Sequence, residues 1–226
     1  MDWLLLESGP GEAAFNMAMD EALLVSMPRL RAPVLRFYSW TERAGSFGYF
    51  QKYLEVEKLT HLRPLVRRPT GGGLVPHDAD WTYSVVFPTN HAWYALPATE
   101  SYRKIHEWIQ AAFSQLGVTT ELAPEARRAG PGQCFAGYEK SDLLWKGIKI
   151  AGAAQRRTRD GLLIQGSVQP GLLKGGRSDW QNAMSAVAAQ FIGGEQEHFH
   201  PDQTLRDLAD DLARDKYSVS RYNRKR

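Results

Sequence analysis

The sequence predicts an α+β (mixed α/β) fold in which helices flank a central mixed β-sheet. Segments rich in β-branched and aromatic residues recur along the chain, the strongest being residues 80–88, DWTYSVVFP. Segments with a helical spacing of apolar residues separate them, the clearest being residues 99–117. Because strands and helices interleave without a repeat or a linker, we expect one domain, residues 1–226, built on a sheet.

The first half of the chain is expected to begin with a strand at residues 3–8 and a helix at residues 11–27. Pro28 follows directly, where that helix is expected to end. Residues 32–40, APVLRFYSW, predict a second strand because they are rich in aromatic and branched side chains. Three shorter segments follow: a glycine-punctuated stretch at 45–51, a brief helix at 56–62, and a strand at 64–70 that runs into a glycine loop.

The second half holds the clearest helix, residues 99–117, with Gly117 where a C-cap is expected. Residues 141–152 predict a hairpin that turns at Lys146-Gly147. The remaining expected elements are a strand at 161–170, helices at 181–192 and 203–215, and a basic, solvated tail at 221–226.

Composition indicates an ordinary globular protein, with 43% hydrophobic and 23% charged residues. A net charge of +3 suits an acidic protein or an anionic ligand and is too weak to indicate nucleic acid. One cysteine permits no intramolecular disulfide. The N-terminus lacks signal-peptide features, and no apolar run approaches the roughly 20 residues of a membrane span. We therefore expect a cytoplasmic monomer with neither a membrane nor a nucleic acid as partner.

Residues 66–78, VRRPTGGGLVPHD, place three consecutive glycines between two predicted strands. Glycine adopts positive φ without steric cost and lets a ligand approach the main chain, where free N–H groups can bind an anion or a carbonyl oxygen. The loop is neither a Walker A motif nor GxGxxG, because the residues after the glycines do not match. The sequence leaves open a plain glycine-rich turn with solvated arginines.

Charged groups stand at both ends of this loop. Arg67 and Arg68 precede it and supply charge-assisted, potentially bidentate donors. His77 follows it, with Asp78 as the expected carboxylate neighbour of a titratable ring. These residues are candidates for binding a ligand and for handling a proton.

Cys134 lies in a glycine- and proline-containing loop, residues 123–135. A lone cysteine is commonly a small buried apolar residue. Four cations are near in sequence, and positive charge favours the thiolate that a nucleophile requires. They are Arg127, Arg128, Lys140 and Lys149. Both roles remain open on the sequence alone.

Lys149 alternates with Ile148 and Ile150 and is expected to point away from the face that the two isoleucines bury. Such a lysine is commonly a surface residue of a strand. The small residues that follow indicate instead the close approach of a backbone or a ligand, with the ammonium as a clamp for a carbonyl or a phosphate. These small residues are Ala151, Gly152, Ala153 and Ala154.

Several of these motifs, in this order, resemble the lipoate–protein ligase and octanoyltransferase branch of the biotin/lipoate ligase superfamily. The resemblance implies the catalytic-domain fold of that superfamily. It covers nearly the whole chain, because AAFNMAMDEALL, VLRFYSW, SFGYFQ and KYSVSRYNRKR also match family positions. The segments that carry it best are RRPTGGGLVPHD, WTYSVV, GIKIAGAAQRR and LLIQGSV.

Within that branch the chain is most similar to octanoyltransferases with a cysteine nucleophile, because Cys134-Phe135 stands fifteen residues before Lys149. The resemblance implies that Cys134 takes an acyl chain as a thioester, that Lys149 stabilises the oxyanion and that His77 handles or orients a proton. Small residues would floor a narrow acyl slot, worth about 0.8 kcal/mol per buried CH₂. The binding residues implied are Arg67, Arg68, Thr70, Gly71, Gly72, Gly73, Gly152, Ala153 and Ala154.

The activity implied is transfer of an octanoyl or lipoyl group from an acyl carrier protein to a lysine of a lipoyl domain, such as the glycine cleavage H protein. No cofactor and no metal are expected. Gly73 departs from the arginine usual in these transferases and matches ATP-using lipoate ligases, so a ligase that uses ATP and Mg²⁺ is the alternative. A non-catalytic acyl-binding homologue is a third possibility. A biotin ligase is disfavoured, because this chain does not contain the Gly-Arg-Gly-Arg-type loop expected there.

Overall fold

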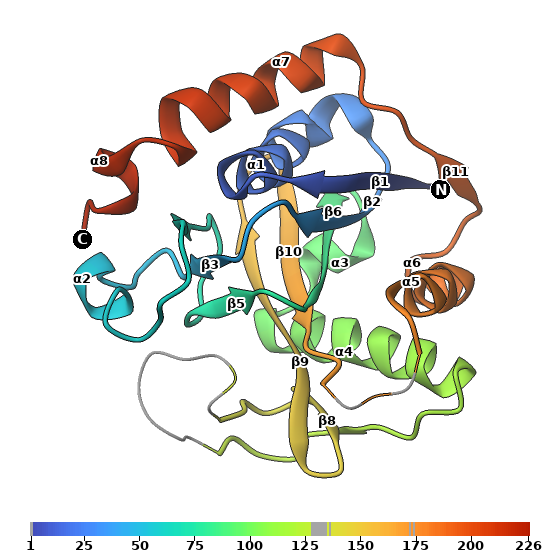
Figure 1. Ribbon diagram of the computed structural model, residues 1–226. Helices are drawn as coiled ribbons and strands as arrows, with labels where there is room; N and C mark the ends of the chain where they lie inside the picture. The colour runs from blue at the N-terminus through green and yellow to red at the C-terminus, as the bar shows by residue number, and fades with distance from the viewer. Residues whose placement is uncertain (1, 128–134, 136, 172, 174) are drawn as a thin grey trace.

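The computed structural model describes residues 2–127, 135, 137–171, 173 and 175–226. Their largest sheet has eight strands, of which the pairs next to β1 are parallel and all others antiparallel. The mixed sheet with helices on both faces confirms the predicted fold class (Figure 1). In spatial order the strands are β11 (Gln196–His198), β1 (Trp3–Gly11), β2 (Val34–Trp40), β6 (Trp81–Pro88), β10 (Gly161–Val168), β9 (Ile148–Arg157), β8 (Leu143–Trp145) and β7 (Glu121–Leu122).

The central strands are buried on both faces, since successive side chains point to opposite sides of the sheet. On β10, Leu162 and Ile164 join the cluster under α4 and α5, whereas Leu163 joins the cluster under α1 and α7. Trp108 of α4 donates its indole N–H to Met184 O at 2.8 Å, which fixes α4 to α5. The covering helices are α1 (Ala13–Leu30), α4 (Ala98–Gln115), α5 (Arg177–Ala186) and α7 (Gln203–Leu212).

A second, three-stranded sheet holds the glycine loop. β3 (Ala44–Phe47) lies between β4 (Leu65–Arg67), to which it is parallel, and β5 (Val75–His77), to which it is antiparallel. The glycine loop therefore connects the two outer strands across the end of β3. Short helix α2 (Tyr53–Val56) follows β3 (Figure 1).

Local sequence signals end α4 and turn the hairpin as predicted. The N–H groups of Gly117 and Val118 donate to Ser114 O and Phe113 O, each at 3.0 Å, and Gly117 has a φ of 71°. This is the glycine-dependent C-cap expected after the helix. The β8–β9 hairpin turns through Lys146 and Gly147, whose φ values of 51° and 74° are those of a type I′ turn.

The alternation expected around Lys149 is wrong. Leu143 pairs with Ala151 and Leu144 pairs with Lys149, so Ile150 is an extra residue in a bulge of β9. The bulge breaks the period of two, and Ile148 is 65% exposed while Ile150 is buried.

Several elements differ from the prediction in their bounds or were not predicted. α1 continues through Pro28 to Leu30, because proline in the last turn removes a single hydrogen bond. The brief helix lies at Tyr53–Val56 rather than 56–62, where a turn follows. The helix expected at 181–192 starts earlier, at Arg177, and divides at Val187 into α5 and α6 (Ala188–Ile192). Helix α3 (Ala92–Ala95) and strand β11 lie in segments too short for a periodic signal.

The C-terminal tail is solvated only in part: Arg221, Arg224, Lys225 and Arg226 are exposed as predicted, whereas Tyr222 and Asn223 pack against the domain. After α7, a π-helical segment (Ala213–Tyr217) leads into α8 (Ser220–Asn223), which packs beside β4. Asn223 is 9% exposed, and its Oδ1 accepts from the Arg67 N–H at 2.7 Å. No helix among the described residues is long and apolar enough to cross a membrane.

Candidate active site

A cavity of about 1320 Å³ opens between the glycine loop, β9, β10 and the first turns of α4. The fold brings the middle of β9 opposite the glycine loop, although the two are far apart in the sequence. Phe135 also lines the cavity. Eight of the residues expected at the site line it: Arg68, Gly72, Gly73, His77, Lys149, Gly152, Ala153 and Ala154.

Lys149 extends from the bulge of β9 into this cavity and is held by a buried carboxylate. Its Nζ lies 2.7 Å from Asp142 Oδ2, and the two side chains are 7% and 0% exposed. The Glu139 N–H also donates to Asp142 Oδ2, at 2.6 Å, and the Tyr102 hydroxyl donates to Oδ1. A buried ion pair of this kind holds its ammonium in one position because every alternative leaves a charge unpaired.

Gly152 provides the volume that the Lys149 side chain occupies. A Cβ at position 152 would lie 2.8 Å from Lys149 Cε and 2.9 Å from Nζ. The same strand therefore carries both the cation and the bare backbone beneath it. This gives a physical reason for a glycine in the AGAA segment that the sequence showed only as a run of small residues.

His106, from α4, lies behind the Lys149–Asp142 pair. It is fully buried, and this desolvation lowers its pKa from 6.5 to about 4, so the ring is neutral at pH 7. Its Nδ1 lies 2.9 Å from Tyr102 O and acts as donor there, because a carbonyl can only accept. Its Nε2 lies 4.0 Å from Asp142 Oδ1.

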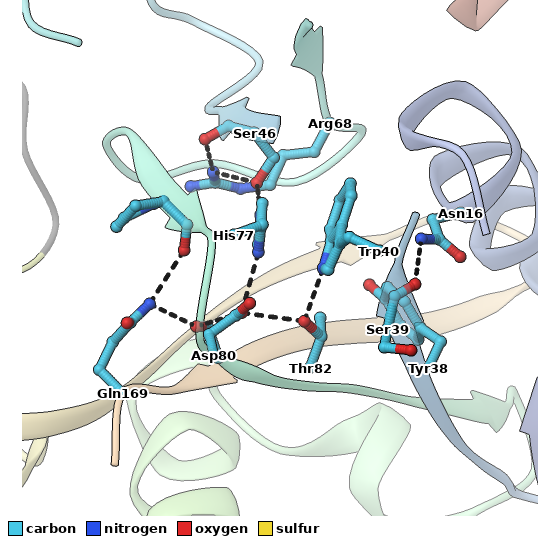
Figure 2. Close-up of polar contacts among 12 residues, drawn as sticks. Asn16, Tyr38, Ser39, Trp40, Ser46, Arg68, His77, Asp80, Thr82 and Gln169 are labelled. Atoms are coloured by element: carbon cyan, nitrogen blue, oxygen red, sulfur yellow. Dashed lines mark hydrogen bonds and ion pairs between the residues drawn. The ribbon is translucent and has the colours of Figure 1, made fainter. Parts of the chain in front are cut away.

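His77 is held between a carboxylate and a hydroxyl (Figure 2). Its Nδ1 lies 2.9 Å from Asp80 Oδ2 and its Nε2 lies 2.7 Å from Ser46 Oγ. The ring stacks on Trp40, with centroids 3.8 Å apart. With Nδ1–H donating to the carboxylate, Nε2 becomes an acceptor for the Ser46 hydroxyl. The sequence predicted Asp78 as the carboxylate next to His77, and this prediction is wrong, because the partner is Asp80.

Asp78 is not that partner because it points outward and forms an ion pair with Arg43 at 3.4 Å. Asp80 instead turns back under the ring. Its Oδ2 also accepts from Thr82 Oγ1 at 2.9 Å (Figure 2). It accepts as well from Ser167 Oγ at 2.7 Å. These contacts from β6 and β10 fix the carboxylate, and through it the ring of His77.

Arg68 braces the glycine loop from within. Its Nη2 donates to Gly71 O at 2.6 Å and to Gly73 O at 2.8 Å, and its Nη1 donates to Ser46 O at 3.1 Å. Gly72 has a φ of 84°, and a Cβ on Gly48 would lie 1.9 Å from Gly72 O. The loop therefore needs glycine for its conformation and for close packing against its neighbour.

Three residues expected to bind substrate lie away from the cavity lining. Arg67 is buried and donates to main-chain carbonyls, among them Gln51 O at 2.7 Å and Asn223 O at 2.8 Å. Thr70 Oγ1 donates to Gln165 Oε1 at 2.7 Å beneath the loop. Gly71 uses its carbonyl to accept from Arg68. Their contacts are those of residues that shape the loop, and Arg67 joins it to the C-terminal segment.

Comparison with known proteins gives the family. A family model described as the lipoyl protein ligase A/B catalytic domain matches residues 12–170. This protein belongs to that family. The match spans the glycine loop, His77, the Cys134 segment and Lys149.

Curated relatives of this chain carry the name octanoyltransferase. Octanoyltransferase LipM of Staphylococcus aureus is 38% identical over 179 residues, which are 74% of this chain and 65% of that protein. Octanoyltransferase LipM of Bacillus subtilis is 37% identical over 179 residues, 74% of this chain and 64% of that protein. The chain thus covers somewhat less than two thirds of the length of these relatives.

Solved structures confirm the fold of the ligase family. A lipoate-protein ligase A bound with ATP superimposes with a TM-score of 0.83 at 23% identity, covering 99% of both chains. Protein Ta0514 of T. acidophilum, described as a putative lipoate protein ligase, superimposes with a TM-score of 0.85 at 23% identity, covering 100% of both chains.

The expected nucleophile of this family member, Cys134, lies outside the described residues, as does Arg128. The next residue in the chain, Phe135, is described. Its ring centroid lies 5.0 Å from Lys149 Nζ, so the cavity wall at Lys149 includes the residue that directly follows the cysteine.

Sequence reasoning missed the residues that position the candidate groups. Asp142 and Asp80 carried a usable signal, since each is a carboxylate directly before an apolar strand near a candidate residue. His106, Tyr102 and Ser46 carried none, because only tertiary packing brings them to the site. The described residues contain no group of three or more side chains suited to hold a metal ion.

Proposed function

We propose that this lipoyl protein ligase A/B family member is an acyltransferase of protein lipoylation. It moves an octanoyl or lipoyl group from an acyl carrier protein, through a thioester on Cys134, to a lysine of a lipoyl domain such as the glycine cleavage H protein. The observation that carries the proposal is the Lys149 ammonium, held by Asp142 inside the cavity and 5.0 Å from the ring of Phe135, the residue after Cys134. The octanoyltransferase relatives support it.

In the first half-reaction the Cys134 thiolate attacks the carbonyl carbon of the carrier thioester. A new C–S bond forms, the old C–S bond breaks, and the thiol of the carrier leaves with the proton that Cys134 gave up. Lys149 donates a hydrogen bond to the oxygen that becomes negative in the tetrahedral intermediate. Asp142 serves by fixing that ammonium in place before the charge develops.

In the second half-reaction the ε-amine of the acceptor lysine attacks the Cys134 thioester. The C–N bond forms, the C–S bond breaks, and the amine must lose a proton. His77 Nε2 accepts it through the Ser46 hydroxyl, with Asp80 holding the ring in the tautomer that leaves Nε2 free to accept. No nucleotide is consumed, because the thioester already carries the activation.

The cavity is suited to a thin acyl chain. Its β9 side is formed by Gly152, Ala153 and Ala154, and its opposite side by Gly72 and Gly73 of the loop that Arg68 braces. Burial of an eight-carbon chain contributes about 0.8 kcal/mol per CH₂, or roughly 5 kcal/mol before the costs of ordering it. Much shorter chains therefore bind more weakly.

Gly73 favours a second candidate function, an ATP-dependent lipoate–protein ligase, because the triple glycine matches ligases at the position where the cysteine transferases carry arginine. A two-part assay separates them. The transferase modifies a lipoyl domain with octanoyl-carrier protein and no ATP, whereas the ligase catalyses lipoate-dependent exchange between ATP and pyrophosphate. Exchange without transfer would refute the proposal, and tight acyl binding without turnover in either assay would indicate a non-catalytic homologue.

A further inference from the structure

Two segments that are distant in the sequence form one surface beside the cavity. Residues 49–63, which contain α2, lie against residues 224–226 at the end of the chain (Figure 1). The Tyr53 N–H donates to Arg226 O at 3.1 Å, and the Lys225 Nζ lies 4.0 Å from the centroid of the Tyr49 ring. We call these eighteen residues the basic patch.

The basic patch exposes apolar side chains that are surrounded by cations. The side chains of Phe50 and Leu54 are large and apolar, yet they are 72% and 64% exposed. The Arg226 guanidinium lies 5.2 Å from the centroid of the Phe50 ring. An aromatic ring and a leucine left in water among positive charges are typical of a protein contact surface.

The net positive charge of the protein is concentrated in this patch. Its six cations and two carboxylates, Glu55 and Glu57, give a net side-chain charge of +4, against +3 for the whole chain. The other residues therefore sum to −1. Charge segregated in this way attracts an acidic partner to one place on the surface. The six cations are Lys52, Lys58, Arg63, Arg224, Lys225 and Arg226.

The patch borders the wall of the cavity that the glycine loop forms. The Tyr49 N–H donates to Thr70 O at 2.8 Å, and Gly48 packs directly on Gly72. Arg156 of β9 lies between the two surfaces, since it donates to Pro69 O at 3.2 Å and its guanidinium lies 5.5 Å from the centroid of the Tyr49 ring. A protein seated on the patch is thus adjacent to the site.

The arginines beside the glycine loop cannot meet that partner. Arg67 is 0% exposed and Arg68 is 4% exposed, and both use their donors on main-chain carbonyls. Arg67 and Arg68 therefore offer no accessible charge to an acidic protein, whereas the cations of the basic patch do.

We propose that the basic patch docks the acyl carrier protein that donates the acyl group, an inference that rests on the proposed function. The choice of the donor follows from charge. The thioester of a carrier protein is attached through an arm that a phosphate joins to the protein. The donor therefore brings a negative charge, which a positive surface attracts. The acceptor instead brings a lysine, a cation that a positive surface repels.

Charge reversal with K225E/R226E tests this inference, because both side chains are exposed and neither lies in the cavity lining. We expect the KM for octanoyl-carrier protein to rise about tenfold or more with kcat retained. The uncharged small thioester octanoyl-N-acetylcysteamine needs no docking, so its kcat/KM stays at the wild-type value. R159E is the matched control, since its side chain is 95% exposed in the β9–β10 turn, and its carrier KM stays unchanged.

Removal of the apolar centre gives a second test that does not alter charge. F50S/L54S is expected to raise the carrier KM severalfold, whereas V25S, at an exposed valine of α1, leaves it unchanged. The inference is wrong if both patch variants keep the carrier KM within twofold of wild type. If those variants also lose binding to anionic phospholipid vesicles, the patch binds anionic lipid instead of the carrier, and the inference is again wrong. It is also wrong if the KM for the acceptor domain rises in place of that for the carrier. Failure of the wild-type protein to use either thioester would refute the proposed function instead.

Discussion

The Lys149 side chain lies over Gly152, on the same strand, in a volume that a single additional carbon would fill. The Cβ of any other residue at 152 would come within 2.8 Å of Lys149 Cε, and the Asp142 carboxylate holds Lys149 Nζ at 2.7 Å. Two features therefore set the position of the ammonium, the ion pair with Asp142 and the absence of a side chain at position 152.

Gly152→Ala is expected to reduce acyl transfer by about 100-fold, because the methyl group displaces the ammonium from the place where the oxyanion forms. The strand backbone accepts alanine and both charges of the ion pair remain, so the loss in free energy of unfolding should be smaller than that of Asp142→Leu. Steady-state transfer rates and urea unfolding measure the two effects.

A double-mutant cycle provides the control for this substitution. In a Lys149→Ala background, Gly152→Ala should cost little further activity, since the group it displaces is already gone. Additive losses would mean that Gly152 acts on the substrate directly and not through Lys149.

The ion pair of Asp142 with Lys149 predicts a pattern in stability. Asp142→Leu alone leaves a cation in the cavity wall without its partner and should destabilise the fold by about 3 kcal/mol. Asp142→Leu with Lys149→Met removes both charges and should be less destabilised than the single variant. Urea unfolding of the wild type, the single variant and the double variant measures these free energies. A double variant that is less stable than Asp142→Leu would contradict the account.

Asp80→Asn tests the orientation of His77. An amide at this position donates to Nδ1, so Nε2 carries the proton and cannot accept one from Ser46. We expect the second half-reaction, acyl transfer from the enzyme to the acceptor lysine, to slow by about 100-fold or more, while acylation of the enzyme by the carrier slows less.

Thr82→Val is the comparison for that variant, because it removes another donor to the same carboxylate oxygen without changing the tautomer of His77. Single-turnover measurements of each half-reaction should show a loss under tenfold. An Asp80→Asn protein that deacylates at the wild-type rate would remove His77 from the proton path.

His106 makes stability depend on pH. Desolvation lowers its pKa to about 4 in the folded protein, while the unfolded chain binds the proton near pH 6.5. As the pH falls from 6.5 to 4 the unfolded state takes up a proton that the folded state does not, so the free energy of unfolding falls by up to roughly 3 kcal/mol.

His106→Asn removes the titrating imidazole and keeps an N–H donor for Tyr102 O. The free energy of unfolding of this variant should therefore fall less between pH 7 and pH 4.5 than that of the wild type. His200→Asn, at an exposed histidine, should behave like the wild type. Urea unfolding at both pH values measures the difference, and equal slopes for all three proteins would show that His106 already binds its proton in the folded state.

Much of the fold and part of the site are local properties of the sequence. The Lys146-Gly147 turn and the Gly117 cap are fixed by neighbouring residues, and the glycine loop and Lys149 stood out by composition. The bulge at Ile150 was not predictable, because it depends on how β8 pairs with β9.

The partners of the candidate groups also depend on tertiary structure. Asp142 reaches Lys149 only when β8 and β9 pair, and His106 approaches Asp142 only when α4 packs on that hairpin. Asn223 binds the main chain of Arg67 across 156 positions, which no pattern in the tail indicates. The exposure of the tail's charged side chains was predictable from the sequence, whereas the burial of Asn223 depends on its contact with β4.

The intact mass of the protein after mixing with octanoyl-carrier protein in the absence of ATP tests the central claim most directly. The account predicts that the wild-type protein gains the mass of one octanoyl group, that Cys134→Ala gains none, and that a lipoyl domain then removes the group from the wild-type protein. Acyl transfer by Cys134→Ala at the wild-type rate would contradict it.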